Sequence, residues 1–154
     1  YMKKQRIIIG SVLEININED YFAYAQVLGK SSCAFFDFRS TERLQDLTVL
    51  RSSQILFIVS VYDNVIKEGR WVNIGNLEID NRLKILPLEF IQDPINVDRF
   101  NIYNPNTGEI IKATREQCEN LECAAVWEAS HIEDRIRDHY LGVSNVWLEQ
   151  TKIK

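Results

Sequence analysis

The sequence predicts an α+β fold, in which a twisted, mostly antiparallel β-sheet carries a C-terminal amphipathic helix packed on one face. Three stretches lead to this prediction. Residues 21–29 alternate in character as a strand does, residues 54–62 are almost continuously apolar, and residues 130–141 repeat apolar side chains every four positions. The chain has 154 residues without a repeat, a low-complexity tract or a Pro/Gly-rich linker, so we expect residues 1–154 to form a single domain.

The stretch YFAYAQVLG, residues 21–29, fits a strand because aromatic and β-branched residues favour strands and Gly29 follows where a turn is needed. Side chains alternate across a strand. One face therefore holds Tyr21, Ala23, Ala25 and Val27, and the other holds Phe22, Tyr24, Gln26 and Leu28. The small side chains of Ala23 and Ala25 predict that a bulky element lies close against their face.

The first half of the chain predicts a meander of short antiparallel strands. The expected strands are 7–17, 21–29 and 33–38, joined by turns at 18–20 and 29–32. Residues 39–53 are polar and are expected to form a loop with room for one helical turn. The apolar run 54–62 is typical of a strand buried on both faces, which places it in the interior of the sheet.

Further strand signals follow at 70–79, where Gly75 indicates a bulge or a close backbone approach. The sequence PNTG at 105–108 has turn chemistry and predicts a second hairpin that includes residues 109–114. Thr114 and Gln117 have the spacing of a capping box, which predicts a short helix at 115–120. Residues 122–129 fit a strand better than a helix.

Residues 130–141 carry the signals of the C-terminal helix. Ser130 and Glu133 form an S-x-x-E capping box, and Gly142 fits the residue that ends the helix. One apolar stripe runs along the helix through Ile132, Ile136 and Tyr140. This helix is the element that we expect to cover Ala23 and Ala25.

The formal net charge is −4, from 18 basic and 22 acidic residues. This balance argues against a nucleic-acid-binding protein, which needs a basic surface, and suits a basic protein partner or simple solubility. The apolar run 55–61 is too short to span a membrane. The basic residues and apolar run near the N-terminus resemble a signal peptide, but Glu14 interrupts them and no small-x-small cleavage site follows.

Two cysteines and two histidines in the last third raise the question of a zinc site. Cys118 and Cys123 have permissible ligand spacing, but His131 and His139 lie eight residues apart on one predicted helix, so their rings diverge. We therefore expect no metal and no cofactor. The odd count of three cysteines also argues against a disulfide framework and fits reduced thiols in the cytosol.

Catalytic motifs are absent from the sequence: there is no G-x-S-x-G, P-loop, G-x-G-x-x-G or H-E-x-x-H. None of Cys33, Cys118 and Cys123 lies in a Gly-flanked turn or at a clear helix N-terminus, where the pKa of a thiol would be lowered. Nothing therefore indicates an activated thiol. By elimination, a binding protein is favoured over an enzyme.

The segment EDRIRD, residues 133–138, mixes acids and arginines on the predicted helix. Glu133 and Arg137 are four residues apart and are expected to form a surface ion pair. Asp134 and Asp138 are expected to point to solvent from a neighbouring face. A solvated helix face explains this pattern, and an acidic edge for a protein partner is the alternative, for which Asp134 and Asp138 are the candidate partner-binding residues.

The order of segments resembles the immunity protein 26 family of bacterial polymorphic toxin systems. The resemblance extends from about Arg6 to Trp147. Its most characteristic pieces are residues 22–29, Trp71 with Gly75, and Glu133, Arg135 and Gly142. It implies a cytoplasmic α+β protein that binds and neutralises a cognate toxin domain, without cofactor or turnover.

Immunity families pair with diverse toxins, often nucleases, so a basic nuclease is one candidate partner. We expect a monomer or a weak dimer that binds neither nucleic acid nor membrane. A small thiol-dependent enzyme and a ligand-binding regulatory domain remain the alternatives.

Overall fold

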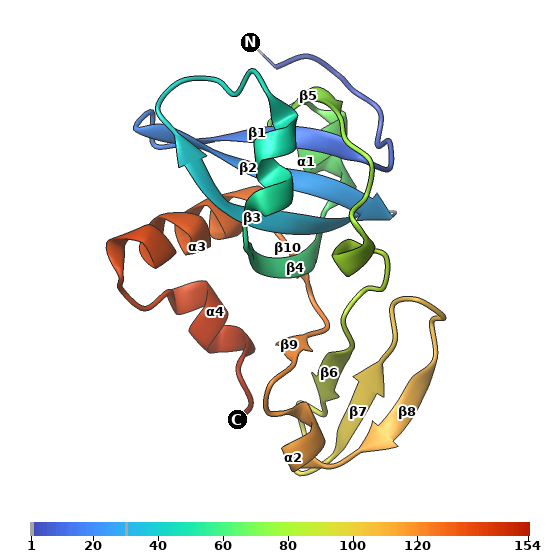
Figure 1. The fold of residues 1–154 in the computed structure, drawn as a ribbon. Helices are drawn as coiled ribbons and strands as arrows, with labels where there is room; N and C mark the ends of the chain where they lie inside the picture. The colour runs from blue at the N-terminus through green and yellow to red at the C-terminus, as the bar shows by residue number, and fades with distance from the viewer. Residues whose placement is uncertain (1, 30) are drawn as a thin grey trace.

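The computed structural model describes residues 2–29 and 31–154, which form two β-sheets with helices packed beside them (Figure 1). The strands are β1 Ser11–Ile17, β2 Tyr21–Gly29, β3 Ser32–Ser40, β4 Ile55–Val61, β5 Val72–Asn76, β6 Glu89–Gln92, β7 Phe100–Tyr103, β8 Ile110–Ala113, β9 Glu122–Cys123 and β10 Val126–Trp127. The α-helices are α1 Asp63–Lys67, α2 Arg115–Cys118, α3 Ala129–Leu141 and α4 Val146–Thr151. The predicted α+β class is confirmed.

The large sheet has the strand order β10-β4-β3-β2-β1-β5, and every neighbouring pair is antiparallel except β10 with β4. Strands β1 to β4 are sequential neighbours, which confirms the predicted meander. Strand β4 is interior, as its apolar run predicted, because β3 pairs with one side and the two-residue β10 with the other.

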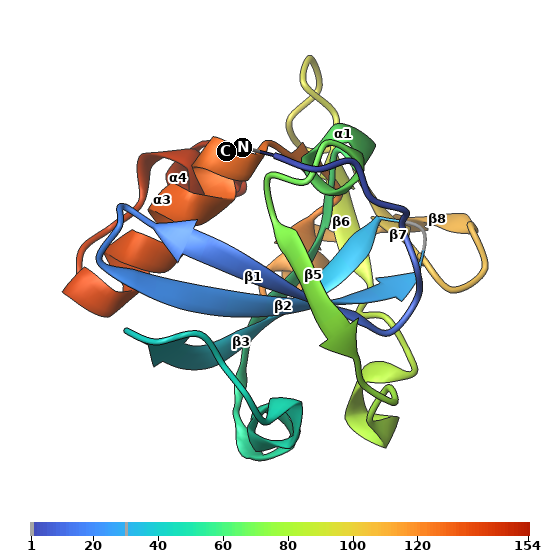
Figure 2. The ribbon, with the colours of Figure 1, turned by 90° about the horizontal axis from the view of Figure 1, so that it is seen from above.

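Strand β2 covers the predicted residues 21–29 and separates two cores. Tyr21, Ala23, Ala25 and Val27 face the core that also contains Ile132 and Ile136 of α3. The opposite face packs Tyr24 and Leu28 under the segment that contains the 3₁₀ helix Leu47–Ser52. Figure 2 shows α3 and α4 on one side of the sheet and this segment on the other. The helix therefore covers the small face of β2, as expected from Ala23 and Ala25.

Helix α3 begins one residue earlier than expected, and the predicted Ser130–Glu133 capping box is wrong. Glu128 occupies the N-cap position without a side-chain hydrogen bond, and Ser130 lies inside the first turn. Glu133 instead accepts hydrogen bonds from Arg70 and Trp71. Its side chain therefore makes a tertiary contact and does not cap the helix. Gly142 ends the helix in the left-handed conformation, as predicted.

The first strand also starts later than expected, at Ser11, because Gly10 adopts a φ of +90° that breaks the extended run. The predicted irregularity at Gly75 is confirmed. It has a φ of +151° and lies opposite a register shift in β1, and an added Cβ would meet Leu47 Cδ1 at 2.8 Å. Glycine is favoured here by its backbone conformation, since the Leu47 methyl is the end of a flexible side chain that can shift.

The small sheet has the order β8-β7-β6-β9 and its own core of Phe90, Phe100, Ile102 and Cys118. The predicted 105–108 turn joins β7 to β8, and the Thr114–Gln117 capping box opens α2. A second sheet was not expected, because strand patterns do not specify which strands pair across long separations. The expected strand at 122–129 is likewise two strands of two residues each, β9 in the small sheet and β10 in the large one.

Candidate partner-binding surface

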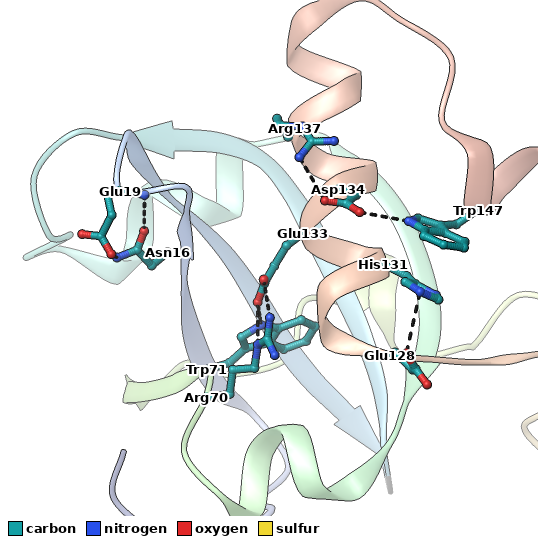
Figure 3. A network of polar contacts seen from close by, with 10 residues as sticks. All are labelled: Asn16, Glu19, Arg70, Trp71, Glu128, His131, Glu133, Asp134, Arg137 and Trp147. Atoms are coloured by element: carbon teal, nitrogen blue, oxygen red, sulfur yellow. Dashed lines mark hydrogen bonds and ion pairs between the residues drawn. The ribbon is translucent and has the colours of Figure 1, made fainter. Parts of the chain in front are cut away.

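Asp134 and Asp138 bind neighbouring side chains within the protein, and Figure 3 shows the contacts of Asp134. Asp134 Oδ2 accepts from the Trp147 indole N–H at 2.9 Å, and Asp138 Oδ2 accepts from the Asn145 amide at 2.8 Å. Arg137 forms salt bridges with both carboxylates, at 3.0 Å to Asp134 and 3.2 Å to Asp138. Only 14% of the Asp138 side chain is exposed, so the expectation that both acids project freely from the solvent side is wrong.

These contacts join α3 to α4, a helix that the sequence analysis did not expect. The His131 ring stacks on Trp147 with 3.7 Å between ring centroids. Asn145 also caps α4 by accepting from the Leu148 N–H at 2.9 Å. The two aspartates therefore have a structural role in holding α4 against α3, and a direct contact with a partner stays a prediction for both.

Glu133 joins α3 to the start of β5. Arg70 donates to its two carboxylate oxygens at 2.8 and 3.1 Å, and the indole N–H of the fully buried Trp71 donates at 2.9 Å (Figure 3). The expected Glu133–Arg137 surface pair does not form, because each side chain has a stronger set of partners elsewhere. Two residues that carried the family resemblance, Trp71 and Glu133, thus meet although they lie 62 positions apart.

The thiols lie in protected surroundings. Cys33 is fully buried, and burial raises its pKa to about 12. Burial also raises the pKa of Cys118 and of Cys123, and the carboxylates of Glu89 and Glu122 add to the effect at Cys123. Thiols with raised pKa values are poor nucleophiles at neutral pH.

The two cysteines considered for zinc both pack in the small-sheet core, and the two histidines contact aromatic rings elsewhere. Cys118 packs in the small-sheet core, His131 stacks on Trp147, and the ring of His139 lies edge-on to Tyr140. Within residues 2–29 and 31–154, no three His, Cys, Asp or Glu side chains gather in a group that could hold a metal ion. No helix in the same residues is long and apolar enough to cross a membrane.

Buried charges lie where the small sheet meets α3. Glu89 on β6 is in register with Glu122 on β9, and Arg135 Nη2 lies 2.7 Å from Glu122 Oε1. The Arg135 guanidinium also lies over the Phe57 ring at 3.7 Å from its centroid. Burial, and secondarily the charge of Glu122, raises the pKa of Glu89 to about 7. Glu89 is therefore the acid of this junction that titrates near neutral pH.

Two clefts open around the small sheet. The larger, of about 960 Å³, lies between the sheets and is lined by residues of both, including Tyr62, Leu86, Tyr103 and Val126. The smaller, of about 630 Å³, lies between the small sheet and the C-terminal helices and includes Arg135, Glu122 and Leu148. Both mix apolar and polar side chains, so either has room for a ligand or for side chains of a partner.

The acidic surplus of the chain is concentrated around the small sheet. Residues 87–128 contain eight acidic and three basic residues, whereas the rest of the chain contains 14 acidic and 15 basic residues. Glu89 and Glu122 are withdrawn from the surface, and Asp98 pairs with Arg115 at 3.6 Å. Within residues 87–128 five further acids remain, against two further basic residues, Arg99 and Lys112; these acids are Asp93, Glu109, Glu116, Glu119 and Glu128.

Large apolar side chains are exposed on the same small sheet. Ile110 and Ile111 in β8 are 57% and 51% exposed, and Ile95 and Val97 lie exposed in the loop between β6 and β7. In Figure 1, β8 is the outer edge of the sheet on the side away from α3 and α4. Exposed apolar groups among surface acids are typical of a protein interface.

A comparison with protein families places these features in context. The family model described as Immunity protein 26 matches residues 8–101 of the chain. The chain belongs to the Immunity protein 26 family. No curated protein and no solved structure matches the chain significantly.

The Immunity protein 26 match covers the large sheet from the turn before β1 through β5, together with β6 and the first half of β7. Strand β8 and helices α2, α3 and α4 lie beyond it, and so do Glu133, Arg135 and Gly142, on which part of the resemblance rested. The membership therefore rests on the sheet scaffold rather than on the C-terminal helix.

The acidic small sheet has one signal in the sequence that the total net charge conceals. A charge count in windows would have found the surplus at 87–128, because the total of −4 averages it with a nearly neutral remainder. The buried position of Glu89 had no such signal, since its register with Glu122 depends on a parallel strand pair formed across more than 30 residues.

Proposed function

We propose that this protein is an immunity protein that binds a cognate bacterial toxin domain in a stoichiometric complex and neutralises it without turnover. The observation that carries the proposal is the Immunity protein 26 match over residues 8–101. In the family's setting, the protein acts in the cytoplasm of the toxin-producing cell. The structure supports a binding role because acids and exposed apolar groups share one sheet, which suits a basic protein partner.

The partner that best fits this surface is a basic toxin domain, for which a nuclease is one candidate. Opposite charges speed the encounter of two proteins, whereas buried apolar anchors slow their dissociation. The association rate should therefore fall as salt rises, since the Debye length is only about 10 Å at 0.1 M. Asp134 and Asp138 would contribute to this long-range attraction and at the same time hold α4 in place.

The thiol-dependent enzyme is not favoured by any observation, because the pKa of each cysteine is raised rather than lowered. A ligand-binding regulatory domain has one supporting feature, the cleft of about 960 Å³ between the sheets. Mass spectrometry of the protein denatured after gentle purification tests this second candidate. A stoichiometric small molecule would support it.

Co-expression with the toxin domain encoded in the neighbouring reading frame tests the main proposal. Cells should survive, and the two proteins should elute together at a one-to-one ratio in size-exclusion chromatography. Cell death despite soluble, folded protein, with no complex formed, would contradict the proposal. Protection at substoichiometric amounts, with the toxin degraded or modified, would replace it by an enzymatic function.

A further inference from the structure

We propose that the open edge of β8 is the docking site for a basic, extended segment of the partner, which adds to the small sheet as a fifth strand. This inference rests on the proposed function, since the partner is taken to be the toxin domain. It assigns the contact to one strand, Ile110–Ala113, and to backbone as well as side-chain groups.

The hydrogen-bond pattern of the β7–β8 hairpin shows which groups face outward. Asn104 N–H donates to the Glu109 carbonyl at 2.9 Å, and the register pairs Ile102 with Ile111 and Tyr103 with Ile110. In an antiparallel ladder, hydrogen-bonded and non-bonded pairs alternate. Ile111 therefore bonds to β7, while Ile110 and Lys112 turn their N–H and C=O groups away from it.

No strand in residues 2–29 and 31–154 pairs with this outer side of β8, which ends the order β8-β7-β6-β9. Proteins usually protect such an edge with charges, prolines or bulges, because free N–H and C=O groups invite another strand. Here Lys112 is the single charged side chain in the strand, beside two exposed isoleucines. The edge thus offers hydrogen-bonding groups and apolar contacts on both faces of the added strand.

Charge decides between the two possible kinds of occupant. A second copy of this chain would bring its own small-sheet region, with the same eight acidic and three basic residues at 87–128, so the two regions would repel each other overall. A basic segment would instead be attracted by this acidic excess, to which the exposed Glu109 and Glu116 beside β8 contribute and which outweighs the single positive charge of Lys112. The surface therefore favours a basic strand from another protein over self-association.

The test uses the substitution Lys112→Pro, with Lys112→Ala as its matched control. Proline removes the outward N–H and obstructs an added strand, but it keeps the bonds of β8 to β7 because Lys112 does not bond to that strand. Alanine removes the same positive charge and leaves the backbone donor. Calorimetric titration with the neighbouring toxin domain should show at least about tenfold weaker binding for Lys112→Pro and at most about twofold change for Lys112→Ala.

Hydrogen exchange gives a second, independent measurement on the wild-type protein. The amides of Ile110 and Lys112 should exchange quickly in the free protein and slow by at least about tenfold in the complex. Thermal unfolding of Lys112→Pro checks that the variant is folded before its affinity is interpreted.

Three results would overturn the inference. Lys112→Pro could bind the toxin as the wild type does, the two amides could stay unprotected in the complex, or sedimentation could show a dimer that Lys112→Pro abolishes. Each of these leaves the immunity function intact if the wild-type protein still neutralises the toxin. A wild-type protein that neither binds nor neutralises the toxin would instead contradict the proposed function itself.

Discussion

The large and small sheets differ in how completely they are covered. The large sheet has a core on each face, one of 18 buried residues beneath α3 and one of eight beneath the segment with the 3₁₀ helix Leu47–Ser52. The small sheet has a core of four buried hydrophobic residues, an open edge at β8 and most of the acidic surplus. The large sheet therefore holds most of the buried core, whereas the small sheet presents more free surface.

The largest expected effect lies in the large sheet. Phe35 is fully buried, stacks on Phe57 at 4.8 Å and lies edge-on to Trp71 at 5.6 Å. Phe35→Ala should lower the free energy of unfolding by about 3–5 kcal/mol through lost burial and an unfilled cavity. Ile111→Ala on exposed β8 should change it by less than about 0.5 kcal/mol. Urea denaturation of both variants measures the two changes in the free energy of unfolding. Equal losses would contradict the expected difference between the two sheets.

The next effect concerns the contact that fixes α3 to the large sheet. Glu133→Ala leaves the buried Trp71 indole N–H without its acceptor and frees Arg70. We expect a loss of about 1–3 kcal/mol, because an unpaired buried donor loses its hydration without compensation. Glu149→Ala, which removes only the exposed pair with Lys152, is the control and should cost less than about 1 kcal/mol. A similar cost for both would show that the Glu133 contact is no stronger than a surface pair.

The junction between the sheets should make stability depend on pH. The folded-state pKa of Glu89, about 7, lies above its ordinary value of 4.5, so the folded protein holds this proton more tightly than the unfolded chain. The stabilisation of the folded protein by this bound proton is fully present below about pH 4.5, declines between pH 4.5 and 7, and is lost above pH 7. Glu89→Gln should therefore stabilise the protein at pH 8, by up to about 2–3 kcal/mol, and have little effect at pH 4.5.

Chemical unfolding of the wild type and Glu89→Gln across pH 4.5–8 measures this dependence. Glu116→Gln is the matched control, because Glu116 is an exposed acid of the same region. Parallel stability curves for the wild type and Glu89→Gln would contradict the assigned titration.

The smallest expected effect separates the two roles of Asp134. Asp134→Asn removes the charge but keeps an acceptor for Trp147, whereas Asp134→Ala removes both. We expect Asp134→Ala to cost about 1 kcal/mol of stability and Asp134→Asn less. Stopped-flow association with the toxin domain should slow by at most about threefold for Asp134→Asn. A larger decrease would place this aspartate in the interface rather than at its rim.

Local patterns in the sequence were sufficient for the elements that have one clear periodicity. The alternation of residues 21–29 predicted β2 with both its faces, and the stripe of Ile132 and Ile136 predicted the helix that covers Ala23 and Ala25. These predictions hold because the period of the side chains and the size of Ala23 and Ala25 already determine which face is buried and what must pack on it.

Sequence patterns gave wrong predictions for side chains that have both a local and a distant partner within reach. Glu133 has the spacing of a capping residue, yet it binds Trp71 and Arg70, since a buried indole N–H needs an acceptor more than an exposed helix terminus does. Asp134 and Asp138 likewise point toward α4, whose position no local signal gives.

The sequence by itself therefore determined the fold class, most of the strands, the covering helix and the family. Only the tertiary structure decided that the strands divide into two sheets, that Glu89 lies beside Glu122, and that β8 is left with an open edge. Secondary structure follows from the order of neighbouring residues, whereas strand pairing, burial and an open edge depend on which distant segments meet when the chain folds.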